Sequence, residues 1–72
     1  MTPAQCRAAR PLIDMSQAGL AGAAVVPVSI IVDFEAGVSE PRHVDAIRQA
    51  LERAGVEFIE GRRPGVRFRK AQ

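Results

Sequence analysis

The basic side chains near the C-terminus are the residues whose type and spacing most clearly suggest a chemistry. Residues 61–72 carry five cations and no acid, a charge of +5, whereas residues 1–60 carry five Arg against eight acids, a charge of −3. Lys and Arg neutralise phosphates, so an anionic partner should meet this segment first, although a solvated basic tail is the competing interpretation. The cations concerned are Arg62, Arg63, Arg67, Arg69 and Lys70.

Catalytic and metal-binding chemistry has no support in the residue pattern. Cys6 is the only cysteine and His43 the only histidine, and neither lies in a pattern typical of metal ligands or of a nucleophile with its base. We therefore expect no enzyme, no cofactor and no metal site. A single cysteine cannot form an internal disulfide, which fits a cytoplasmic protein, and no run approaches the ~18 apolar residues of a membrane span.

The 72 residues allow one small domain, which we divide into a helical part over residues 1–55 and a β-hairpin with a basic tail over residues 56–70. Thr2, Pro3 and Gln5 predict the capped start of a first helix. Pro11 should kink or end that helix near Arg10, because it removes a backbone hydrogen bond. The residues expected to face inward are Cys6, Ala9, Leu12 and Ile13.

Two further helices and a hairpin follow from the pattern. Ser16 predicts a helix through about residue 24, with Leu20, Ala21 and Ala24 inside. Residues 41–54 predict another, with Val44, Ile47, Ala50, Leu51 and Ala54 on one face. Residues 56–59 and 66–69 have the composition of short strands joined by a glycine-containing loop. Residues 25–34 are rich in β-branched side chains, and their local propensity alone favours a strand.

The order of motifs resembles the small Cro/CI-type (XRE) helix-turn-helix regulators of alphaproteobacteria. The resemblance rests on residues 2–10, 15–17, 20–21, 33–35, 37, 46–48, 50–52, 54–59 and 64–67, and so covers nearly the whole chain. It implies a mostly α, compact, lambda repressor-like bundle of four to five short helices, here with a C-terminal β-hairpin. It also implies a recognition helix over about residues 28–36, in place of the strand that propensity favours.

The first functional hypothesis follows from this resemblance: a small transcriptional regulator, dimeric, that binds double-stranded DNA. The resemblance places Gln17 at a phosphate-contacting position, although a solvent-facing residue of a first helical turn is an equal alternative. Ser29 provides the one hydroxyl of the expected reading surface. The basic residues listed above, Arg62 to Lys70, would neutralise phosphates.

Departures from the family pattern support a second hypothesis. Val25 replaces a glycine that takes a positive φ, and Pro27 replaces the capping Ser or Thr. No cation lies between Arg10 and Arg42, where the acids are Asp14, Asp33, Glu35 and Glu40. The alternative function is a protein–protein interaction module, antirepressor or antitoxin-like, on a helix-turn-helix scaffold that has lost operator reading. Its interface would consist of Val28, Ile30, Val32 and Phe68. The competing interpretation is that the apolar residues of the third helix repack into the core and form no interface.

Overall fold

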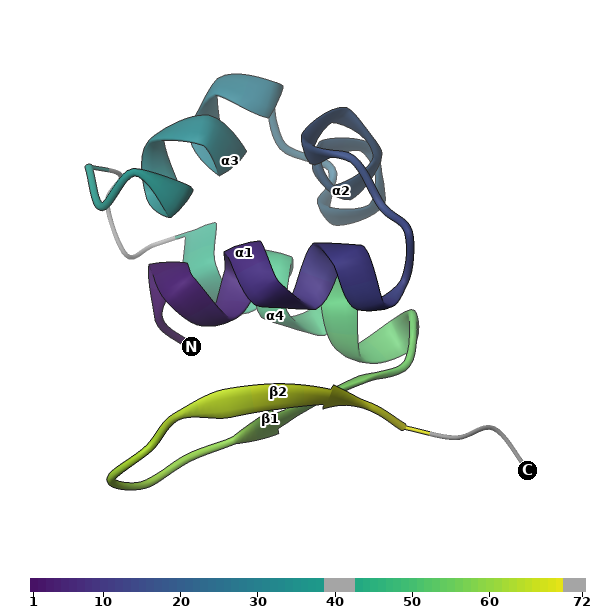
Figure 1. The fold of residues 1–72 in the computed structure, drawn as a ribbon. Helices are drawn as coiled ribbons and strands as arrows, with labels where there is room; N and C mark the ends of the chain where they lie inside the picture. Colours follow the sequence, from purple (N-terminus) through teal and green to yellow (C-terminus); the bar gives the residue numbers. More distant parts are fainter. Residues whose placement is uncertain (39–42, 70–72) are drawn as a thin grey trace.

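The computed structural model of the chain describes residues 1–38 and 43–69, which form four helices and one antiparallel hairpin (Figure 1). The predicted mostly α fold with a C-terminal hairpin is therefore confirmed. The helices lie above the hairpin in Figure 1, with α3 at the end of the molecule farthest from the strands. The elements are α1 (Pro3–Leu12), α2 (Gln17–Ala24), α3 (Val28–Glu35), α4 (Val44–Arg53), β1 (Val56–Ile59) and β2 (Gly65–Phe68).

Helix α1 begins with the predicted capping box. The Thr2 backbone N–H donates to Gln5 Oε1 at 2.8 Å, and the Gln5 N–H donates to Thr2 Oγ1 at 3.1 Å. The predicted end near Arg10 is wrong, because α1 runs through Pro11 to Leu12. Pro11 lies in the last turn, where its missing N–H removes a single bond. Leu12 was also predicted to face inward but is 42% exposed, since it lies at the very end of the buried stripe.

Helices α2 and α3 form a sharply bent pair. Ser16 caps α2 by accepting from the Gly19 N–H at 2.9 Å, and the predicted inner residues Leu20, Ala21 and Ala24 are buried. The α2 and α3 axes differ by 117° across a three-residue turn. Among the described residues no single helix has the length and hydropathy of a membrane span, and this bent pair reaches them only when both helices are counted together.

Residues 28–35 are helical despite their β-branched composition, as the resemblance implied. Ile31 and Phe34, three residues apart, are both buried in the common core, and burial of these large side chains outweighs the local strand propensity. Pro27 precedes the helix without a side-chain cap, and Val25 takes the left-handed conformation at φ 58° and ψ 49°. Both of these features match the departures noted in the sequence.

Helix α4 presents Ile47, Ala50 and Leu51 to the core, as predicted, and its described part is Val44–Arg53. His43 stands at its N-terminal boundary without a side-chain capping bond. Residues 39–42, where the predicted start falls, lie outside the described part of the chain, as does Lys70. The predicted inner face of α4 is therefore confirmed for Ile47, Ala50 and Leu51.

The hairpin is joined to the helices through Gln5. Strands β1 and β2 pair from Val56↔Phe68 to Ile59↔Gly65. The Gln5 side chain is buried, and its Nε2 donates to the carbonyl oxygens of Ile59 at 3.1 Å and Gly65 at 3.0 Å. With Oε1 already accepting from Thr2, the Gln5 amide uses both its donors and its acceptor. It therefore connects the start of α1 with the far end of the hairpin.

We predict that Val25→Gly stabilises the protein. A β-branched residue in the left-handed region is strained by roughly 1–3 kcal/mol, and the Val25 side chain, 88% exposed, recovers little of this by burial. Gly has a greater conformational entropy in the unfolded state, which offsets part of this relief. The free energy of unfolding should therefore rise by about 1 kcal/mol, which corresponds to a rise of about 5 °C in Tm in thermal unfolding.

The matched control is Val38→Gly, which removes another exposed valine (72%) that lies outside the positive-φ region. This control should leave Tm unchanged or lower it. A lower Tm for Val25→Gly would contradict the strain argument.

Candidate nucleic-acid interface

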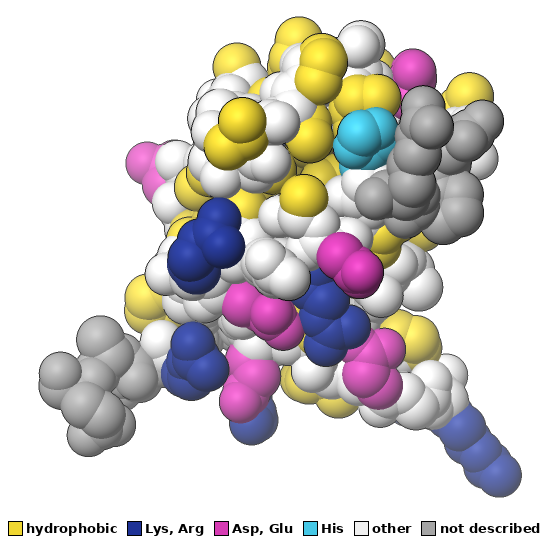
Figure 2. Space-filling view, turned by 180° about the vertical axis from the view of Figure 1, so that it is seen from behind, with side chains coloured by type: hydrophobic (Ala, Val, Ile, Leu, Met, Phe, Trp, Pro, Cys, Tyr) yellow, Lys and Arg dark blue, Asp and Glu magenta, His cyan; other side chains and the backbone are white. Residues whose placement is uncertain are grey.

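Helix α3 presents one side to the core and the other to solvent. Ile31, Phe34 and Glu35 are buried, whereas Val28 and Val32 are 46% and 44% exposed. Ser29 and Asp33, each one residue further along, are exposed as well, so the four side chains follow the helical repeat as one outer face. Figure 2 shows apolar side chains gathered over the α2–α3 end of the molecule, with Arg and acidic side chains over the α4–hairpin end.

The predicted apolar interface is only partly assembled. Ile30 was expected to be exposed with Val28 and Val32, but it is half-buried and packs against the core, so it does not belong to the outer face. Phe68 is 52% exposed, but it lies on the hairpin beside Gly55, at the opposite end of the molecule from α3 (Figure 1). The outer face of α3 therefore keeps two of the four predicted residues.

A buried carboxylate holds the inner side of α3 against α1 and α2. Glu35 is 5% exposed, and its Oε2 and Oε1 accept from Arg10 Nε at 2.7 Å and Nη2 at 2.9 Å. Gln17 Nε2 donates to Oε1 at 3.1 Å, and the Cys6 thiol donates to Oε2 at 3.2 Å. Arg7 adds a bond from its guanidinium to the Glu35 backbone carbonyl. We refer to Cys6, Arg10, Gln17 and Glu35 as the Glu35 network.

The pKa values in this network follow from burial and hydrogen bonding. Burial raises the pKa of Glu35, but the hydrogen bonds from Arg10, Cys6 and Gln17 outweigh it, and the pKa lies below its ordinary value. Burial, followed by the hydrogen bond to Glu35, raises the pKa of Cys6 to about 12. The thiol is therefore neutral at pH 7 and suited to donating a hydrogen bond, and a neutral thiol is a poor nucleophile. Within residues 1–38 and 43–69, no three His, Cys, Asp or Glu side chains are grouped to hold a metal.

Sequence reasoning missed the Glu35 network. Glu35 is grouped in the sequence with the other acids between Arg10 and Arg42, although Ile31, Phe34 and Glu35 follow the i, i+3, i+4 spacing of a single helix face. That spacing places Glu35 on the same face as two large apolar residues, and it was the signal from which its burial could have been predicted. Gln17 is half-buried and its amide donates inward to Glu35, so it is not simply a solvent-facing residue of a first helical turn. Its phosphate contact stays a prediction. A phosphate contact by Gln17 would have to share or replace this bond.

The basic residues of the hairpin differ in their surroundings. Arg67 pairs with Glu57, and Arg69 Nη2 donates to the Glu52 carbonyl oxygen at 3.4 Å. Arg62 and Arg63 are exposed in the loop between the strands, and no carboxylate of the described residues forms an ion pair with either. The loop lies far from α3 (Figure 1), so the structure separates the predicted phosphate contacts from Gln17 and Ser29.

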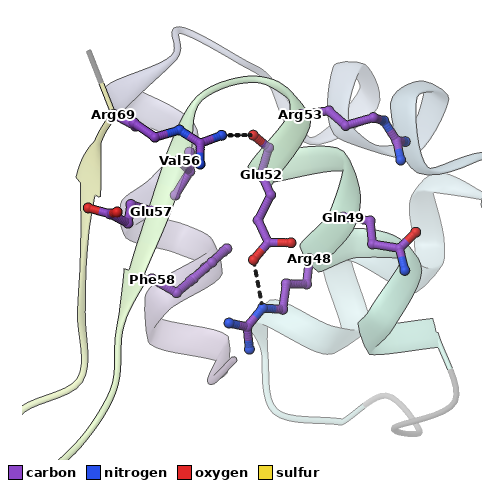
Figure 3. Close-up of a pocket in the computed structure, with 8 residues that line it drawn as sticks. All are labelled: Arg48, Gln49, Glu52, Arg53, Val56, Glu57, Phe58 and Arg69. Atoms are coloured by element: carbon purple, nitrogen blue, oxygen red, sulfur yellow. Dashed lines mark hydrogen bonds and ion pairs between the residues drawn. The ribbon is translucent and has the colours of Figure 1, made fainter. Parts of the chain in front are cut away.

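A groove of about 500 Å³ lies between α4 and the hairpin (Figure 3). The Arg48 guanidinium is 5.1 Å from the centroid of the Phe58 ring, and its Nε is 3.1 Å from Glu52 Oε2. Arg48 Nη1 also lies 3.7 Å from Glu60 Oε2. Carboxylates therefore pair with Arg48, whereas Arg53 and Arg69, which also line the groove, donate to the backbone carbonyl oxygens of Ala23 and Glu52. Its lining residues are Arg48, Gln49, Glu52, Arg53, Val56, Glu57, Phe58 and Arg69.

No protein-family model matches this chain, and no curated protein matches it at a significant level.

We predict that Glu35→Gln lowers the free energy of unfolding by about 2 kcal/mol at pH 7. The substitution leaves the partly buried Arg10 guanidinium without its counterion. Since the native pKa of Glu35 is lowered, its stabilisation is present above the ordinary Glu pKa of about 4.3 and is lost as the pH falls through the native value. Urea unfolding from pH 7 to pH 3 should therefore show the difference from the wild type shrinking toward acid.

Glu52→Gln is the matched control, because Glu52 pairs with Arg48 on the exposed side of α4. An exposed i,i+4 pair contributes at most about 0.5 kcal/mol. If the two variants lose the same free energy of unfolding at pH 7, the Glu35 network contributes no more to stability than a surface ion pair.

Proposed function

We propose that this chain is a small cytoplasmic DNA-binding regulator of the Cro/CI-type (XRE) helix-turn-helix class, with a lambda repressor-like arrangement of helices. The observation that carries the proposal is the α2–α3 pair, whose 117° bend across three residues has the geometry of a helix-turn-helix motif. In such motifs the second helix enters the major groove. Here that helix is α3, with its inner side buried and its outer side open to a partner.

The Glu35 network supports this proposal. Base reading requires a helix that keeps its position relative to the helix that contacts the backbone. Glu35 on α3 is bonded both to Arg10 on α1 and to Gln17 at the first position of α2. The outer face of α3 is thereby held in a constant orientation relative to the start of α2. The resemblance adds dimer formation to the proposal.

The electrostatic contribution should come from the hairpin loop. Arg62 and Arg63 are its exposed cations without an ion-pair partner among the described residues, whereas Arg67 is paired with Glu57. Because the loop lies at the opposite end from α3, these arginines would contact phosphates of a different DNA segment from the one that α3 reads. Deleting the hairpin would not test this, because Gln5 is bonded to both strands.

We predict that a random-sequence duplex binds at low salt and dissociates as salt rises, measured by fluorescence titration. Each phosphate contact contributes about 0.9 to the slope of log affinity against log salt. The double variant Arg62→Gln and Arg63→Gln should therefore reduce the slope by about 1.8. Arg67→Gln is the control, and its effect should be smaller because Arg67 already has a carboxylate partner. Absence of binding to any duplex at low salt would overturn the proposed function.

A protein-interaction module is the second candidate, and the half-exposed Val28 and Val32 are the observation that favours it. In this case the chain would associate with itself or with another protein through α3, without binding DNA. Size-exclusion chromatography with light scattering distinguishes the two. A mass that rises with concentration, and that Val28→Ser restores to the monomer, would favour the interaction module.

A further inference from the structure

The outer face of α3 has a distinctive chemical composition. It offers two isopropyl groups from Val28 and Val32, one hydroxyl from Ser29 and one carboxylate from Asp33. This face carries no guanidinium, ammonium or carboxamide group. Its polar groups therefore accept hydrogen bonds more readily than they donate them, since only the Ser29 hydroxyl can donate.

This composition selects among the base edges of the major groove. Guanine presents two acceptors, usually bound by Arg or Lys, and adenine is usually bound in a bidentate manner by Asn or Gln. The outer face of α3 has none of these side chains. Thymine presents a C5-methyl group that accepts apolar contact, and the cytosine N4 amine donates to a carboxylate. The outer face of α3 is therefore complementary to pyrimidines and poorly suited to purines.

The spacing of the valines also agrees with DNA. Val28 and Val32 are four residues apart, which corresponds to about 6 Å along a helix axis. Two base steps along one strand span about 6.8 Å. The two isopropyl groups can therefore contact methyl groups two base pairs apart, and the buried Ile31 and Phe34 keep both valines on the outer side.

The same face is a poor protein contact. A standard interface buries about 800 Å² per partner, roughly a sixth of the 4689 Å² surface of this chain. Two half-exposed valines provide only a small part of that area. A two-fold contact between two copies through α3 would also bring two Asp33 carboxylates close together, and like charges in such a contact oppose association.

We propose that α3 reads pyrimidine edges: Val28 and Val32 contact the methyl groups of two thymines two base pairs apart, and Asp33 accepts a hydrogen bond from a cytosine amine. This inference rests on the proposed DNA-binding function and specifies the class of base pairs recognised. Asp33 also adds discrimination, because its carboxylate is repelled wherever the groove presents only acceptors.

The test begins with enrichment of bound duplexes from a random-sequence pool. The enriched sequences should contain two thymines two base pairs apart, with one base pair between them, and a nearby cytosine. Replacing each of these thymines in turn by deoxyuridine, which lacks only the methyl group, should weaken binding about 4-fold per position. Val28→Ala should abolish this thymine–deoxyuridine difference at one of the two positions and Val32→Ala at the other. Val38→Ala, an exposed valine beyond α3, should preserve both differences.

Asp33 is tested by exchange of specificity. Asp33→Asn converts an acceptor into an amide, so the enriched cytosine should be replaced by adenine. Circular dichroism verifies that each variant remains helical. If duplexes bind with no thymine–deoxyuridine difference, this inference fails while the proposed function stands. If no duplex binds at low salt, the proposed function itself fails. Self-association that Val28→Ala removes would assign the valines to a protein contact and would also overturn the inference.

Discussion

The arrangement of the helices depends on one buried carboxylate. Glu35 accepts two hydrogen bonds from Arg10 and one from Gln17, so three helices converge on a single side chain. A buried charge is unfavourable unless it is fully paired, and the Cys6 thiol completes the set of donors. Because each donor comes from α1 or α2, α3 cannot rotate about its axis without breaking an ion pair.

That constraint explains how the outer face of α3 can be so unusual. The positions of Ile31, Phe34 and Glu35 are set from inside, so the residues at 28, 29, 32 and 33 are free to vary without affecting the core. Val25 shows the limit of this freedom, since a β-branched residue is held at φ 58° by the helices on either side. The turn keeps its geometry even with a residue that disfavours it. The bent pair is thus determined by packing more than by the turn sequence.

The sequence was most informative where the structure depends on neighbouring residues. The capping box of Thr2 and Gln5, the buried face of α2 and the hairpin were all predicted from local patterns. Local propensity favoured a strand at residues 28–35, and only the family resemblance predicted the helix. Propensity fails here because the helix is stabilised by burial of side chains in the tertiary core. The Glu35 network and the separation of Arg62 from Ser29 were not predicted, since both depend on how distant segments pack. Ile30 shows the same limit, because which side of α3 is buried follows from tertiary contacts.

The Gln5 amide has a consequence for how the chain folds during synthesis. Its two carbonyl partners are 54 and 60 residues away along the chain. When α1 leaves the ribosome, the capping box can form, but the Nε2 of Gln5 must remain hydrated until β2 has been made. The first helix therefore gains its last two hydrogen-bond partners only after residues 59 and 65 have been made. The helices alone would leave the Gln5 amide without these partners, so the domain reaches its native state only once the hairpin has joined α1, and contacts of such long sequence separation slow folding.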